Sequence, residues 1–251
     1  MEIVFLSAIG VGFSTIFGAL IGFILRKPSL KFNNIMLSFA SGVMLAASIW
    51  GLIIPSIEYG KFSFLITVLG VFCGALLIEL CNKAVPHLHS ITGIDDGHLS
   101  ENEDKINKVL LFVIAIGVHN RPAGLATGVS FGTGNISDAI MVSLSIALQN
   151  IPEGMVIIAP MLSLGISKTR TLGIAFLTGA IEIIGTLIGY LLVSVISGIL
   201  PFLLALAGGS MIFVIVDELI PETNENERPR GVSYALLFGF SLMVIINSIL
   251  N

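Results

Sequence analysis

Hydrophobic residues fill long stretches of the chain, with short polar breaks between them. Roughly 20 consecutive apolar residues in a helix cross the hydrocarbon core of a bilayer. The pattern therefore predicts an all-α bundle of eight transmembrane helices, with 1–251 as a single transmembrane domain. Gly165 and Ser167 form the only strong break between the fifth and sixth spans. The predicted spans are 3–25, 33–56, 62–85, 107–131, 137–163, 170–195, 201–220 and 231–250.

The composition supports a membrane protein. Hydrophobic residues make up 55% of the chain and charged residues only 11%, against about 25% charged residues in ordinary soluble domains. The chain has no basic cluster that would predict a nucleic-acid partner. The lipid bilayer is the expected environment. Cys73 and Cys81 lie in one apolar stretch and predict neither a disulfide nor a zinc knuckle.

The basic residues predict the orientation of the bundle. Ten of the 12 Lys and Arg residues lie on the side reached after odd-numbered spans, whereas Lys61 lies on the other side and Arg121 lies inside a span. Loops rich in Lys and Arg stay in the cytoplasm. We therefore expect a multi-pass protein of the cytoplasmic (inner) membrane with both termini outside.

The loop at 86–106 would then face the cytoplasm. It contains His and acidic residues, which allow two interpretations: an ordinary solvated loop, or a weak and exchangeable metal site. The residues concerned are His87, His89, Asp95, Asp96, His98, Glu101, Glu103 and Asp104.

Two similar polar motifs lie in the middle of the fourth and fifth spans. Residues 119–124 read His-Asn-Arg-Pro-Ala-Gly, and residues 149–154 read Gln-Asn-Ile-Pro-Glu-Gly. Polar and ionisable side chains at this depth are costly and usually functional. Pro122 and Pro152 remove helix hydrogen bonds beside them, so we expect each helix to be opened and kinked near its polar residues.

The polar side chains of these motifs suit a metal ion. Gln149 and Glu153 are four residues apart and share a helix face. With His119 they offer nitrogen and oxygen ligands that suit a divalent first-row metal. Asn120 and Asn150 could form a second layer, Glu182 lies near mid-depth in the sixth span, and Met44 in the second span could add a thioether. The candidate metal ligands are His119, Gln149, Glu153, Met44, Asn120, Asn150 and Glu182.

In these motifs the chain resembles the ZIP (Zrt/Irt-like) family of divalent-metal transporters, in its prokaryotic branch. The resemblance also includes 42–48 in the second span and the Asp-Glu-Leu-Ile-Pro-Glu motif at 217–222. It implies an eight-helix bundle with both termini outside and a metal path between helices four and five. By resemblance, the primary metal site is His119, Gln149 and Glu153 with Met44 nearby, and an adjoining site is Asn120, Asn150, Glu153 and Glu182.

Two residues depart from the family pattern. Ala123 stands where the family usually has a Glu that bridges both sites, and Arg121 stands where it usually has an apolar residue. The loss of one carboxylate predicts weaker binding of a dication and puts a second metal in doubt. Arg121 needs an anionic partner. It is expected either to pair structurally with another helix or to neutralise Glu182 in place of the second metal.

These residues predict a transporter that imports Zn²⁺, Fe²⁺, Co²⁺ or Mn²⁺ as its substrate. The sequence contains no phosphate-binding loop, so we expect no coupling to ATP. We expect no resident cofactor. The sequence does not decide whether the protein forms a homodimer. The alternative is a metal-binding membrane regulator that does not transport, which Ala123 motivates. An intramembrane hydrolase with Glu153 as base would need a zinc motif such as His-Glu-x-x-His, which the sequence lacks, so we expect no enzyme.

Overall fold

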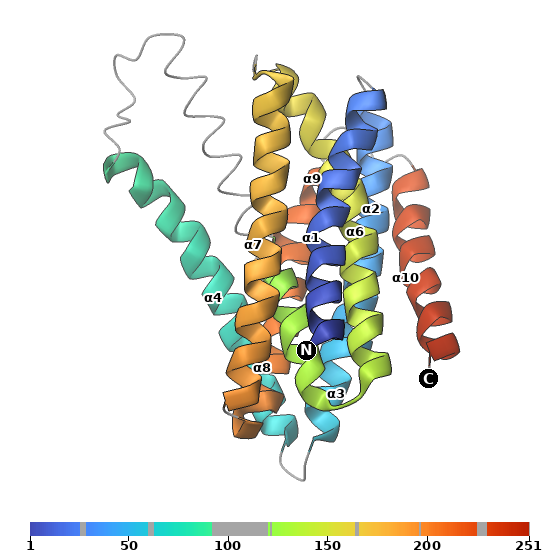
Figure 1. Cartoon of the computed structure of the whole chain (residues 1–251). Helices are drawn as coiled ribbons and strands as arrows, with labels where there is room; N and C mark the ends of the chain where they lie inside the picture. Colours follow the sequence, from blue (N-terminus) through green and yellow to red (C-terminus); the bar gives the residue numbers. More distant parts are fainter. Residues whose placement is uncertain are drawn as a thin grey trace.

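The computed structural model describes residues 1–25, 29–59, 63–91, 120, 122–163, 166–195, 197–224 and 230–250. Nearly all of these residues are helical, and no strand occurs among them. The long helices are α1 (Glu2–Leu25), α2 (Leu30–Ala46), α4 (Ser63–Ile91), α6 (Ile136–Ser163), α7 (Lys168–Val195), α8 (Leu200–Val214) and α10 (Arg230–Leu250). Most of them run side by side as a bundle, whereas α4 slants away from the others toward its C-terminal end (Figure 1).

Seven helices in the described part of the chain are long and apolar enough to cross a membrane. They match seven of the eight predicted spans to within a few residues. The fourth predicted span, 107–131, lies mostly outside the described residues, but 122–130 is helical. α4 ends at one end of the bundle and α6 begins at the other (Figure 1). The predicted all-α membrane bundle is confirmed.

Glycines allow the helix backbones to touch. Apolar side chains gain little by leaving lipid for another apolar surface, so membrane helices associate through close packing of small residues. α1 packs against both α6 and α7, α2 against α10, and α4 against α8. A Cβ on Gly12 of α1 would lie 2.5 Å from the carbonyl oxygen of Gly179 in α7. Gly42 and Gly239 play the same part between α2 and α10.

The second and seventh spans each contain a wide π-helical turn that the sequence did not predict. The turns are η1 (Ala47–Ile53) and η4 (Ile215–Leu219), and each precedes a short helix, α3 (Ile54–Glu58) or α9 (Ile220–Asn224). Pro55 and Pro221 are the second residues of these short helices. A proline ring clashes with the carbonyl four residues earlier, and a π turn relieves that clash by widening the helix. By contrast, α6 is one uninterrupted helix through Pro152, so the expected kink there stays a prediction.

Candidate metal site

Glu182 of α7 lies at the centre of a buried polar cluster. Its side chain is fully buried. It accepts a hydrogen bond from the Thr15 hydroxyl at 3.1 Å, and the Asn150 Nδ2 donates to its two oxygens at 2.8 and 2.9 Å. The cluster therefore joins α1, α6 and α7 at one point in the interior of the bundle.

The close helix packing sets the position of this cluster. A Cβ on Gly154 of α6 would overlap the backbone oxygen of Thr15 in α1. A Cβ on Gly124 would lie 2.7 Å from the backbone oxygen of Glu182, so the helical segment 122–130 also lies against α7 there. The bare backbones of these two glycines let four helical segments converge on Glu182.

Two amide oxygens at or beside this cluster have no hydrogen-bond partner among the described residues. Gln149 and Asn150 are each 1% exposed, and Oε1 of Gln149 and Oδ1 of Asn150 are both buried. A buried acceptor without a donor is costly, so native structures usually supply a partner. A cation is such a partner, and amide oxygens are suitable ligands for it.

Glu153 adds negative charge to the same helix. It follows Gln149 by four residues and so lies on the same face of α6. Its side chain is half-buried. A cation that binds between the amide oxygens and this carboxylate would supply the partner that the unpaired oxygens lack.

The other candidate ligands are only partly placed. Asn120 and Met44 are buried, at 4% and 2% exposed, and Met44 belongs to the same hydrophobic core as Ala123. His119 and Arg121 lie outside the described residues, as does most of the loop 86–106. Within the described ranges, no three His, Cys, Asp or Glu side chains gather as a metal cluster.

Sequence reasoning did not identify Thr15 as a site residue. Thr15 is 1% exposed and lies in an α1 stripe with Gly12, Gly18 and Gly22. Such a stripe of small residues predicts a close helix contact, and a hydroxyl within it could have been recognised as facing another helix. Its partner is 167 residues away, so no local pattern indicates it.

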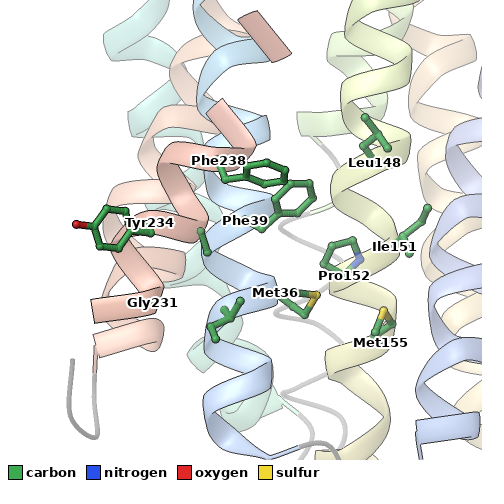
Figure 2. A pocket seen from close by; sticks show the side chains of 11 residues that line it. Met36, Phe39, Leu148, Ile151, Pro152, Met155, Gly231, Tyr234 and Phe238 are labelled. Carbon is green, nitrogen blue, oxygen red and sulfur yellow. The ribbon is translucent and has the colours of Figure 1, made fainter. Parts of the chain in front are cut away.

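A groove of about 570 Å³ beside Pro152 is a different kind of surface. It lies between α2, α6 and α10, and its walls include Met36, Phe39, Met155 and Phe238 (Figure 2). The only polar ring there, Tyr234, points away from Pro152 (Figure 2). The groove is therefore separate from the candidate ligands Gln149 and Glu153, which lie on a different face of α6.

The fold and the buried polar cluster define a polytopic helical membrane protein with a candidate cation site. Comparison with known proteins gives the family. The family model for the ZIP Zinc transporter matches residues 81–247, and the chain belongs to this family.

Individual relatives match over nearly the whole chain. The chain is 35% identical to the Zinc transporter ZIPB of Bordetella bronchiseptica, over 95% of this chain and 78% of that protein. It is 33% identical to the Zinc transporter GufA of Myxococcus xanthus, over 94% of each. It is 31% identical to the Zinc transporter ZupT of Streptococcus mutans, over 93% of this chain and 92% of that protein. The resemblance noted from the motifs is therefore confirmed, and the relatives support transport of a divalent metal ion.

Proposed function

We propose that this protein imports a divalent transition-metal ion, first of all Zn²⁺, through a mid-membrane site between α6 and the fourth span. The observation that carries the proposal is the pair of buried, unpaired amide oxygens on Gln149 and Asn150, one turn from the Glu153 carboxylate. His119, which precedes Asn120 in the fourth span, would supply an imidazole. Nitrogen and oxygen ligands of this kind also accept Fe²⁺, Co²⁺ and Mn²⁺.

The ligand set supports binding of one ion that is released easily. Ala123 supplies no carboxylate where the family pattern has one, and two of the proposed ligands are neutral amides. A dication held by few anions keeps part of its positive charge in a low-dielectric setting, which limits affinity. Transport needs a site that is favourable to enter and weak enough to leave. The chemistry is binding and release, with no bond broken, so we propose no enzymatic role.

Uptake into vesicles tests the proposed function. The purified protein is placed in metal-free vesicles that enclose a metal-sensitive dye, and Zn²⁺, Fe²⁺, Co²⁺ and Mn²⁺ are offered singly and then in competition. We expect saturable uptake that empty vesicles lack, with Zn²⁺ competing against the other three. If the protein binds zinc but no zinc enters the vesicles, transport is contradicted. That result would favour the alternative of a metal-binding membrane regulator, which the missing carboxylate at Ala123 suggested.

We further propose that both termini face outward and that 86–106 faces the cytoplasm. α2, α7 and α10 begin at the same end of the bundle, opposite to the two termini (Figure 1). Lys31, Lys168 and Arg170 lie at or near these helix starts. Basic residues at one end of a bundle mark the cytoplasmic end.

Cysteine labelling tests this topology. Cys73 and Cys81 are both free and are first replaced by Ser. In that background, Lys61→Cys should react with a membrane-impermeant maleimide in intact cells, and Ser100→Cys should react only after the cells are opened. Labelling of Ser100→Cys from outside, with Lys61→Cys protected, would reverse the proposed orientation.

A further inference from the structure

Thr15 departs from the hydrogen-bonding habit of the other buried threonines in the described helices. Thr127, Thr178 and Thr186 each donate to a backbone carbonyl three or four residues earlier in their own helix. This local bond is the usual choice of a helical Ser or Thr in an apolar setting. The hydroxyl of Thr15 instead crosses to Glu182 of α7.

Asn150 of α6 also bonds to α1. The Val11 carbonyl, four residues before Thr15, accepts a hydrogen bond from Nδ2 of Asn150 at 3.2 Å, in addition to one from the Ser14 hydroxyl. The same Nδ2 donates to Glu182, which Thr15 also contacts. Asn150 is therefore bonded both to α1 and to the carboxylate that Thr15 holds.

The bonds of Nδ2 determine which end of the Asn150 amide faces the candidate site. A side-chain amide has a donor end, Nδ2, and an acceptor end, Oδ1. Nδ2 is surrounded by three acceptors, namely the Val11 carbonyl and the two Glu182 oxygens. The amide cannot turn over without placing its oxygen against three other oxygens. Oδ1 is consequently held in the direction where it finds no donor in the described part of the chain.

We propose that Thr15 is a positioning residue for metal binding: it holds the Glu182 carboxylate so that Glu182 and the Val11 carbonyl fix Asn150 with Oδ1 toward the cation. The inference rests on the proposed function, since it assigns the cation to the unpaired oxygens of Gln149 and Asn150. Thr15 acts through Glu182 and Asn150 and does not itself touch the metal. Its role adds α1 to the elements that determine the affinity of the site.

The test compares three variants with the wild-type protein in zinc uptake. Thr15→Val keeps the shape and removes the donor, whereas Thr15→Ser keeps the donor. Thr178→Val removes an equally buried hydroxyl, 1% exposed, that bonds only its own backbone. We expect Thr15→Val to raise the apparent KM for Zn²⁺ about tenfold, roughly the worth of one hydrogen bond to a charged group. The maximal rate should change little, and Thr15→Ser and Thr178→Val should stay within about twofold of the wild-type KM.

Two results would overturn the inference. One is an unchanged KM in Thr15→Val, whatever happens to its melting temperature in detergent, because Thr15 would then serve packing alone. The other is an equal loss in Thr15→Ser, because the hydroxyl would then not be the cause.

A zinc titration of the detergent-solubilised proteins separates this inference from the proposed function. If the wild-type protein shows no uptake but binds zinc, transport fails, and a Kd about tenfold weaker in Thr15→Val still supports the positioning role. If wild-type uptake is saturable and both the KM and the Kd of Thr15→Val equal those of the wild type, only the positioning role fails.

Discussion

Replacing Glu153 by Gln is expected to abolish saturable zinc uptake. The substitution keeps the shape and one oxygen ligand but removes the negative charge that lies one turn from Gln149. The remaining ligands on α6 would then be neutral amides, and a dication would enter a low-dielectric site with little compensation. We expect uptake by Glu153→Gln in vesicles to fall to the level of protein-free vesicles, at least a hundredfold below wild type if the lost interaction costs about 3 kcal/mol.

Two further variants make this result specific. His119→Ala should abolish saturable uptake in the same way, because His119 is the proposed nitrogen ligand. Glu58→Gln provides the matched control, since Glu58 is exposed at the end of α3 and should leave uptake unchanged. Wild-type kinetics in Glu153→Gln would show that the Glu153 carboxylate is not a ligand of the transported ion.

Replacing Gly18 by Ala is expected to separate α1 from α6 and to destabilise the bundle. A Cβ on Gly18 would overlap the backbone oxygen of Ile151, and backbone cannot move aside as a flexible side chain can. Overpacking usually costs about 1–3 kcal/mol, and we expect the upper part of that range here. The unfolding temperature in detergent, followed by the fluorescence of Trp50, should fall by several degrees.

Gly10 in the same helix offers the control. A Cβ at this position would meet nothing within 4 Å, so Gly10→Ala should leave the unfolding temperature unchanged or slightly raised. Because Ile151 follows Asn150 directly, Gly18→Ala should also weaken zinc uptake, while Gly10→Ala should not. Equal unfolding temperatures in the two variants would show that α1 and α6 do not pack through bare backbone.

Most of the fold could be predicted because span length and apolar character are read residue by residue. The predicted break near Gly165 and Ser167 falls between the end of α6 at Ser163 and the start of α7 at Lys168. The π turns before Pro55 and Pro221 could not be predicted in the same way. A proline shows that a carbonyl loses its partner, but whether the helix kinks or widens depends on the helices packed around it.

The candidate site was predicted in part. Gln149, Asn150 and Glu182 are buried at mid-span, as their positions in the apolar stretches indicated, and Asn150 and Glu182 are in direct contact. Thr15 was missed because one hydroxyl in an apolar helix normally bonds its own backbone. Its bond to Glu182 depends on how α1 lies against α7, which the pattern within α1 does not reveal. The roles of His119 and Arg121 remain predictions.

Anomalous diffraction from crystals grown with zinc tests the central claim most directly, because it locates and counts the bound ions. We predict one strong peak in the bundle interior, with the Gln149 and Asn150 side-chain oxygens and the Glu153 carboxylate as the nearest described atoms, at bonding distances of about 2.0–2.2 Å for those that ligate. Glu153→Gln crystals should lose that peak. A peak far from α6, or two adjacent peaks of full occupancy despite Ala123, would contradict a single transported ion held by this site.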